Sequence, residues 1–264
     1  MALHSINLCD GYGGFELALK PFGIRTVARV ERDAYAAAVL VERMAQARLD
    51  HCPIWDEVGS FDGNPWRGNV DIITAGFPCP DFSTAGKRRG VNGTQWLWPD
   101  LSRIIGEVKP EWVILENVPG FVRLGGLARV LSDLAVLGFD AEWGLLSASA
   151  AGASHKRKRF WLVAHSNGDR RTTERFPLVY SETRDADACR STSTQWPPLR
   201  HEASEWDGWI LAGGPQPFLC RSSDGPPCGL ADALHLGGNG LVPQAAREAI
   251  VQLARRFTFQ PKEV

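Results

Sequence analysis

Strand-like and helix-like segments alternate along residues 5–166 of this 264-residue chain. One strand-like run, VDIITAGF at 70–77, is apolar enough to be buried on both faces of a sheet. Helix-like segments place apolar residues three or four positions apart, as at Phe15, Leu19 and Phe22. This alternation predicts an α/β fold with a doubly wound, mostly parallel sheet. The expected strands are 5–10, 26–31, 70–77, 111–117, 139–148 and 159–166, and the expected helices are 14–22, 32–49, 99–108 and 125–138.

Residues 167–236 break this alternation. They are rich in Thr, Ser, Arg, Pro and Gly, yet they carry aromatic residues that disordered segments usually lack: Trp196, Trp206, Trp209 and Phe218. We therefore expect a small irregular second domain here. A helical pattern returns near the end of the chain, with one apolar side formed by Ala246, Ile250, Leu253 and Phe257. A helix within 237–264 is expected to complete the main domain of residues 1–166.

The composition excludes several classes of protein. Hydrophobic residues make up 44% and charged residues 22%, as in ordinary globular proteins. No apolar run approaches the roughly 20 residues of a membrane helix, and the first residues do not resemble a signal peptide. The six cysteines are scattered without a Cys-x-x-Cys pair, so neither a metal site nor a disulfide is expected. We expect an intracellular protein with no membrane contact.

Positive charge is concentrated in two places, although the net charge is only −1. Residues 154–175 hold 7 basic against 2 acidic side chains, and Lys87, Arg88 and Arg89 form a second cluster. The distribution of charge matters more than its sum, so these clusters are compatible with binding to a nucleic acid. A solvated surface is the alternative interpretation.

Unusual residues collect where four expected strands end. The turn GYGG follows the first strand, Glu31 ends the second, Cys79 follows the third, and Glu116 ends the fourth. In an open parallel sheet, ligands bind beyond the carboxyl ends of the strands. The four positions therefore predict a single crevice.

The glycine turn and Glu31 together indicate a nucleoside-type cofactor. Gly11, Gly13 and Gly14 let the backbone turn tightly and approach a ligand. The dinucleotide fingerprint G-x-G-x-x-G is incomplete, because Glu16 occupies its last position. An acidic residue at the end of the next strand suits a ribose diol, so an adenosine-type cofactor is expected. The alternative is a tight turn beside a surface acid.

Cys79 lies between two prolines at a strand end. Pro78 and Pro80 lack N–H donors and stiffen the backbone, which would hold the thiol still for covalent attack. A small buried side chain is the alternative interpretation.

Glu116 and a basic strand are the remaining candidates for the predicted site. Glu116 ends an apolar strand, where burial tends to raise a carboxyl pKa and suits a general acid. Strand periodicity places Arg157 and Arg159 on one face, and Lys156 and Lys158 on the other. Paired arginines suit a polar heterocyclic ligand. The alternatives are an internal salt bridge for Glu116 and a basic edge strand for the arginines.

Six motifs follow one another along the chain: NLCDGYGG, VERD, GFPCPDFS, LENV, HKRKRF and GGNGLVP. In this order they resemble the DNA (cytosine-5) methyltransferases in their short bacterial and phage form. The resemblance implies the S-adenosylmethionine-dependent methyltransferase fold, S-adenosylmethionine as cofactor and double-stranded DNA as substrate. It also implies that 1–166 with 237–264 form the catalytic, cofactor-binding domain, and that 167–236 form a target-recognition domain.

The resemblance further implies roles for individual residues. Cys79 would attack C6 of a cytosine flipped out of the duplex, and Glu116 would act at N3 of the ring. Arg157 and Arg159 would hold the base carbonyl. The residues implied for the cofactor, with Glu31 at its ribose and Asp56 near its adenine, are Cys9, Gly11, Tyr12, Gly13, Gly14, Glu31, Arg32, Asp56, Pro78, Leu97 and Asn239. The residues implied for DNA are Ser83, Lys87, Arg88, Arg89, Lys156, Lys158, Arg170 and Arg171.

Several positions depart from the family's pattern. Cys9 and Arg32 stand where aromatic residues are common, Asn7 replaces an Asp, and Pro80 and His155 each replace a Gln. The reacting groups are all present. The departures therefore concern the details of the cofactor pocket rather than the reaction.

Three other functions fit parts of the sequence. An inactive DNA-binding relative would not need its reacting residues intact, and a related enzyme would act on RNA. A nicotinamide oxidoreductase with a thiol nucleophile would have a complete glycine fingerprint and a larger second domain. We expect an active cytosine-5 methyltransferase, monomeric and cytoplasmic, encoded by a bacterium or a phage. The sequence leaves open whether it works beside a restriction endonuclease or alone.

Overall fold

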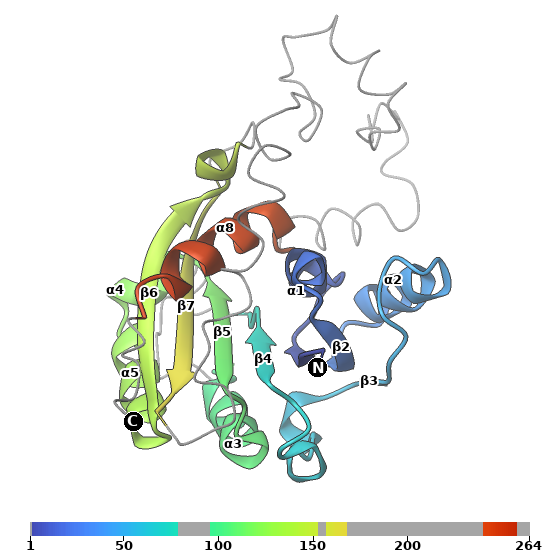
Figure 1. Ribbon diagram of the computed structural model, residues 1–264, viewed down its shortest axis with the longest axis horizontal. Coiled ribbons are helices and arrows are strands. Elements are labelled where there is room, and N and C mark those ends of the chain that lie inside the picture. The colour runs from blue at the N-terminus through green and yellow to red at the C-terminus, as the bar shows by residue number, and fades with distance from the viewer. Residues whose placement is uncertain (1, 79–95, 153–156, 168–239, 258–264) are drawn as a thin grey trace, which may run out of the picture.

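Seven strands form one sheet in the part of the chain that the computed structural model describes, residues 2–78, 96–152, 157–167 and 240–257 (Figure 1). The strand order is β3-β2-β1-β4-β5-β7-β6. The strands are β1 (His4–Leu8), β2 (Arg25–Val30), β3 (Ile54–Trp55), β4 (Ile72–Ala75), β5 (Trp112–Asn117), β6 (Phe139–Ser147) and β7 (Lys158–Ser166).

The sheet is parallel from β3 to β5 and antiparallel at one edge, because β7 runs opposite to both β5 and β6. This confirms the predicted doubly wound, mostly parallel sheet. Each predicted strand is present, with ends within two residues of those expected. The expected strand 5–10 stops at Leu8, because Cys9 turns the chain with a φ of 53°. β3 was not predicted, since two residues carry no recognisable alternation.

Helices cover both faces of the sheet. The helix α2 (Ala34–Ala45) is shorter than the predicted 32–49. Asp33 caps its first turn by accepting a hydrogen bond from the Ala36 N–H at 2.8 Å, and Ala47 bends the chain beyond its end with a φ of 54°. The other helices are α1 (Gly14–Leu19), α3 (Trp98–Val108), α4 (Gly120–Arg123), α5 (Gly126–Val136) and α8 (Pro243–Ala254), with short 3-10 helices at Lys20–Phe22, Val58–Ser60, Asn64–Trp66 and Ala148–Ala151.

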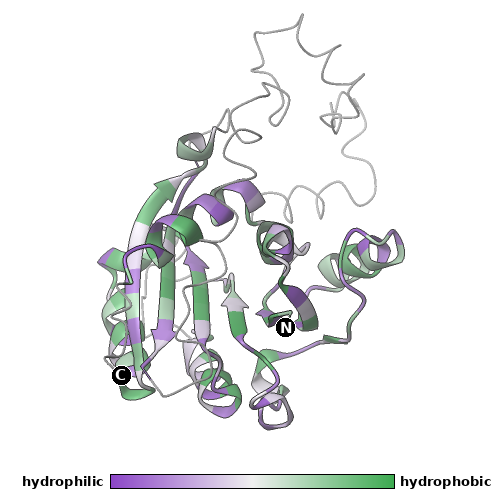
Figure 2. Cartoon of the chain, viewed as in Figure 1, coloured by the Kyte–Doolittle hydropathy of each residue, from purple (hydrophilic) through white to green (hydrophobic). Residues whose placement is uncertain are grey.

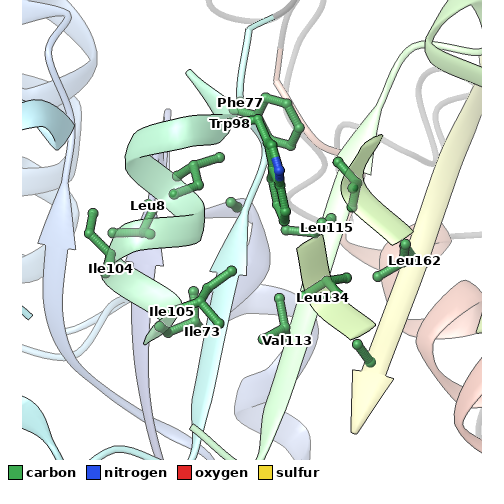
Figure 3. Close-up of a cluster of buried hydrophobic side chains, with 14 of the residues drawn as sticks. Leu8, Ile73, Phe77, Trp98, Ile104, Ile105, Val113, Leu115, Leu134 and Leu162 are labelled. Carbon is green, nitrogen blue, oxygen red and sulfur yellow. The ribbon is translucent and has the colours of Figure 1, made fainter. Parts of the chain in front are cut away.

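One hydrophobic core lies between the sheet and the helices α3, α4 and α5 (Figure 3). The helix α3 directs Trp98, Ile104 and Ile105 at the sheet, where Ile73 and Val113 belong to the same cluster. All five are at most 1% exposed. Full burial of an aliphatic side chain of this size stabilises the fold by roughly 1.5–3 kcal/mol. The start of α3 is therefore firmly anchored beside the carboxyl end of β4.

A second core lies on the opposite face, between the sheet and the helices α1 and α8. Ala246, Ile250 and Leu253, which the sequence placed on one side of the last helix, are 0% exposed, and Phe257 packs against the same core. Among the described residues, no helix is long and apolar enough to cross a membrane. Residues 168–239 lie outside the described part of the chain, so the second domain stays a prediction.

The strand order reverses between β1 and β4. The chain adds β2 and β3 on one side of β1 and then crosses to β4 on the other side, so the connections diverge at the carboxyl ends of these strands. Figure 2 shows β5 hydrophobic along most of its length and hydrophilic at its carboxyl end, where Glu116 and Asn117 lie. The polar end of β5 therefore faces the place where ligands bind in such sheets.

Candidate active site

A cleft of about 540 Å³ opens where the strand order reverses. Its wall combines the carboxyl ends of β1, β2, β4 and β5 with the start of α3 and the segment that precedes α8. Of the residues predicted for the cofactor, those that line this cleft are Cys9, Gly11, Glu31, Arg32, Pro78 and Leu97. Glu116 and Arg159 line the same cleft, so one cavity joins the two groups of residues predicted to react and to bind.

The three glycines of the GYGG turn lie in different surroundings. Gly11 lines the cleft, and its φ of 60° is one that glycine adopts readily. At Gly13, a Cβ atom would lie only 2.6 Å from the Leu49 side chain. At Gly14, a Cβ atom would lie 3.0 Å from the Leu241 side chain. Gly13 also has a φ of 87°, which favours glycine, whereas Gly14 owes its small size to Leu241. Of the three, only Gly11 borders the cleft.

Glu31 fixes the glycine turn and still faces the cleft. Its Oε2 accepts a hydrogen bond from the Gly11 N–H at 2.7 Å, and its Oε1 accepts one from the Asp33 N–H at 2.8 Å. Burial raises the pKa of Glu31, and these backbone hydrogen bonds oppose the rise. Because each carboxylate oxygen accepts more than one hydrogen bond, Glu31 keeps the capacity to accept ribose hydroxyls.

The remaining predicted cofactor residues differ in whether they line the cleft. Arg32 has an 83% exposed side chain that pairs with Glu57 at 3.5 Å. Asp56 is exposed and does not line the cleft. The Tyr12 hydroxyl donates to the Leu241 carbonyl oxygen instead of facing the cleft. The structure therefore brings part of the predicted cofactor set together and leaves Asp56 and Tyr12 outside the lining.

An ion cluster beneath the glycine turn was not predicted. Arg29 of β2 pairs with Asp10, at 2.5 Å, and with Glu16, and all three side chains are 0% exposed. Glu16 also accepts a hydrogen bond from the Asp50 N–H at 2.6 Å. The cluster ties the residue before the turn to the helix after it. An arginine inside the apolar strand TVARV, with Glu16 in place of the fingerprint glycine, was the signal in the sequence.

Glu116 is buried at the end of β5 and pairs with Arg159 of β7, with 2.9 Å between Oε1 and Nε. Burial raises the pKa of Glu116 to about 7, against the opposing effect of the Arg159 and Arg157 charges. Its Oε2 would lie 3.7 Å from a Cβ atom added to Gly76, which directly follows β4. Glu116 therefore holds or releases a proton near neutral pH, next to the strand that leads to Pro78 and Cys79.

Asn117, the last residue of β5, joins two strand ends. Its Nδ2 donates to the Phe77 carbonyl oxygen at 3.2 Å, and its Oδ1 accepts from the Val118 N–H at 2.8 Å. The side chain is buried, so these hydrogen bonds are shielded from water. Asn117 thereby anchors the backbone that leads into Pro78. It stood in a recognised motif, but the sequence did not identify it as a site residue.

The two arginines of the basic segment lie on one face, as the strand period predicts. Arg157, Arg159 and Trp161 line a small cavity of about 10 Å³ together with Glu116. Lys158 is exposed. The guanidinium of Arg157 donates through Nη2 to the Gly240 carbonyl oxygen, so it contacts the segment before α8. Only Arg159 of this pair lines the large cleft.

Several predicted residues lie outside the described part of the chain: Cys79, Ser83, Lys87, Arg88, Arg89, Lys156, Arg170, Arg171 and Asn239. The described residues nonetheless define the chemistry available to a bound ligand. A carboxyl that titrates near neutrality and a guanidinium face a largely apolar cleft, and backbone groups and Glu31 lie at its other end. Such an arrangement polarises a heterocycle at one end and holds a second, hydroxyl-bearing ligand at the other.

Comparison with known proteins finds methyltransferases. The Neisseria gonorrhoeae Type II methyltransferase M.NgoMIV is 33% identical over 63% of this chain and 53% of its own length. The Type II methyltransferase M.NaeI of Lentzea aerocolonigenes is 29% identical over 96% of this chain and 58% of its own length. The chain thus spans little more than half the length of these two curated relatives.

Solved structures share the fold. The Entamoeba histolytica methyltransferase EhMeth matches with a TM-score of 0.55 at 14% identity, over 66% of this chain and 56% of its own. A variant of Spodoptera frugiperda DNMT2 matches with a TM-score of 0.52 at 23% identity, over 64% of this chain and 53% of its own. The family model for C-5 cytosine-specific DNA methylase matches residues 3–200, well over half of the chain. The chain therefore belongs to the C-5 cytosine-specific DNA methylase family.

Proposed function

We propose that this protein transfers a methyl group from S-adenosylmethionine to C5 of a cytosine in duplex DNA. The observation that carries the proposal is the Glu116–Arg159 pair, which opens onto the same cleft as the glycine turn and Glu31. A methyl transfer needs its two ligands side by side, and a single cleft supplies both places. Family membership supports the same reaction.

The described residues fit the cofactor. The Gly11 backbone and the Glu31 carboxylate offer polar partners at one end of the cleft, and Val58, Phe77 and Leu97 supply apolar walls. The cleft volume lies within the usual range of roughly 300–1,000 Å³ for small-molecule sites. When bound, S-adenosylmethionine would supply an electrophilic methyl group. Gly11 and Glu31 would hold the ribose end in place.

The base would be held and activated from the β5 side. Protonated Glu116 would donate to N3 of the flipped cytosine, and Arg159 would orient the Glu116 carboxyl and contact the ring. The Cys79 thiolate would form a bond to C6, which moves the electrons of the C5–C6 double bond onto C5. After methylation at C5, which leaves S-adenosylhomocysteine, loss of the C5 proton to water re-forms the double bond and expels the thiolate, and the N3 proton returns to Glu116. Cys79 is thereby regenerated.

The remaining assignments extend the same proposal. Residues 167–236 would read the DNA sequence. Lys156, Lys158, Arg170 and Arg171 would contact phosphates, which position the protein without specifying bases. The predicted basic cluster at Lys87, Arg88 and Arg89 would add to these phosphate contacts. We further propose a monomer that acts in the cytoplasm beside a restriction endonuclease.

Incubation with tritiated S-adenosylmethionine and duplex DNA tests the reaction. We expect label in DNA from the parent protein and none from Cys79→Ser. The control variant is Cys52→Ala, because burial raises the pKa of the Cys52 thiol to about 11 and this side chain does not line the cleft. Label in structured RNA but not in DNA would contradict the proposal.

A second assay tests the covalent step. DNA that carries 5-fluorocytosine should form a stable adduct with the parent protein, because fluorine at C5 cannot leave as a proton. The adduct is read by gel electrophoresis under denaturing conditions. Transfer to DNA without an adduct would show that the reaction does not pass through Cys79.

A further inference from the structure

Residues 240–242 form a short segment that leads into α8, and we call it the return segment. Gly240 and Leu241 line the cleft opposite the strand ends, together with Gly11 and Glu31. The helix α8 begins directly after Val242 and packs against β6, β7 and α1. One wall of the cleft therefore depends on where the return segment lies.

Three contacts fix the return segment. The Tyr12 hydroxyl donates to the Leu241 carbonyl oxygen, and Arg157 Nη2 donates to the Gly240 carbonyl oxygen. Gly14 lies so close that an added Cβ would be 3.0 Å from the Leu241 side chain and 3.2 Å from its carbonyl oxygen. Two of these contacts come from the glycine turn, and the third comes from the basic segment beside Glu116.

Tyr12 is itself held in place from the other side. Arg43 of α2 donates through Nη1 to the Tyr12 carbonyl oxygen at 2.7 Å, and its guanidinium lies over the Tyr12 ring at 5.0 Å from the centroid. Such a cation–π contact restricts the ring. Burial raises the pKa of the Tyr12 phenol, so the hydroxyl remains a donor at neutral pH. A fixed ring with a protonated hydroxyl is suited to hold a backbone carbonyl.

We infer that Tyr12 is a positioning residue that holds the return segment against the glycine turn and so preforms the cofactor cleft. This inference rests on the proposed use of the cleft for S-adenosylmethionine. Tyr12 acts through Leu241, since its side chain does not line the cleft. Preorganisation of this kind increases affinity, because the ligand does not have to order the wall on binding.

Calorimetric titration with S-adenosylmethionine tests the inference. Loss of one hydrogen bond is expected to weaken cofactor binding by Tyr12→Phe roughly 2- to 12-fold. The rate of methyl transfer at saturating cofactor should stay within about twofold of the parent, because uniform binding affects KM and not kcat. The matched control is Tyr35→Phe, which changes a 37% exposed tyrosine on α2. Equal affinities of Tyr12→Phe and the parent would overturn the inference.

A steric variant perturbs the same contact without removing the hydroxyl. Gly14→Ala places a methyl group against Leu241 and should push the return segment away from the turn. It is expected to weaken cofactor binding in the same direction as Tyr12→Phe. The double variant should weaken binding by less than the product of the two single effects, because both act on one contact. Independent, multiplying effects would contradict a shared role.

Hydrogen exchange of the ligand-free protein gives a readout that does not need the cofactor. In Tyr12→Phe, amides at the start of α8 should exchange faster than in the parent, whereas amides of β4 and β5 should not change. Unchanged exchange at the start of α8 would overturn the inference. If the parent does not bind S-adenosylmethionine, the proposed function fails, but this exchange comparison still tests whether Tyr12 holds the return segment.

Discussion

Two clusters of arginine and carboxylate border the same cleft and differ in the exposure of their side chains. Under the glycine turn, Arg29 meets Asp10 and Glu16, with every side chain 0% exposed. At the end of β5, Arg159 meets Glu116, with side chains 21% and 10% exposed. Burial raises the pKa of Asp10 to about 6 and that of Glu116 to about 7. A raised pKa alone therefore does not separate the two clusters.

The difference lies in access and in the number of partners. Arg29 is shared by two carboxylates and also donates to the Asp50 carbonyl oxygen at 3.3 Å, so the cluster joins the turn after β1 to β2 and α1. Arg159 pairs with a single carboxylate, and both side chains line the cleft. Perturbed pKa values occur at functional sites and in structural ion networks alike. Because Glu116 faces the cleft and the Arg29 cluster is enclosed, we propose Glu116 as the group that meets a ligand, whereas Arg29 is the centre of a buried ion network.

The largest expected effect is on the reaction. Glu116→Gln should lower the rate of methyl transfer about 10²- to 10⁴-fold, because the amide cannot donate and recover a proton as the acid does. The variant should fold and keep its affinity for S-adenosylmethionine. Transfer rates and calorimetry measure both. Glu142→Gln, at a 39% exposed carboxylate of β6, serves as the matched control. Activity within tenfold of the parent would place the acid elsewhere.

The next largest effect is on the free energy of unfolding and concerns the cluster of Arg29, Asp10 and Glu16. Arg29→Met should lower the free energy of unfolding by about 3–5 kcal/mol, because it leaves two carboxylates buried without a cation. Urea denaturation measures it. Arg129→Met, which removes a 62% exposed partner of Asp133, should change stability by less than about 1 kcal/mol. Similar losses in both variants would mean that the buried cluster has no special structural role.

The pH dependence of stability distinguishes the clusters more finely. The folded pKa of Glu116, about 7, lies above its usual 4.5, so the folded state binds more protons between these values. The stabilisation from this proton is fully present below about 4.5 and is lost as the pH rises through 7. Glu116→Gln should therefore gain about 2–3 kcal/mol relative to the parent between pH 5 and pH 8. If the difference in unfolding free energy between Glu116→Gln and the parent is the same at pH 5 and pH 8, the pKa of Glu116 is not raised.

The smallest expected effect tests the partner of Glu116. Arg159→Lys keeps the charge but loses the Nε hydrogen bond at 2.9 Å, so the carboxylate form of Glu116 becomes less favourable. The fall in activity at high pH should therefore move upward by about one pH unit or less. The pH–rate profile with saturating DNA and cofactor measures the shift. A shift toward lower pH would show that Arg159 does not stabilise the Glu116 carboxylate.

Most of the fold followed from local patterns. The strands were predicted within two residues of their ends, because buried parallel strands form apolar runs bounded by turn residues. The one missing strand, β3, is too short for a pattern. The end of α2 was misplaced because the Ala-rich sequence favours a helix beyond Ala45, and the turn at Ala47 overrides this propensity.

The site was predicted unevenly. Strand ends placed Glu31 and Glu116 in one cleft, since the carboxyl ends of parallel strands meet at one edge of the sheet. The three glycines of the GYGG turn looked alike, yet of these only Gly11 borders the cleft. Gly13 is required by its φ of 87°, and Gly14 by its contact with Leu241. A tight packing neighbour that lies far along the chain leaves no local signal.

The sequence by itself determined the alternation of strands and helices and the residues at each strand end, because periodicity and turn chemistry are properties of neighbouring residues. Only the tertiary structure decided that Arg29 is the centre of a buried network, and that Tyr12 meets a carbonyl 229 residues away. Burial and long-range hydrogen bonds depend on which elements pack together. The same two residue types, an acid and an arginine, thus hold a turn together in one cluster and line the open cleft in the other.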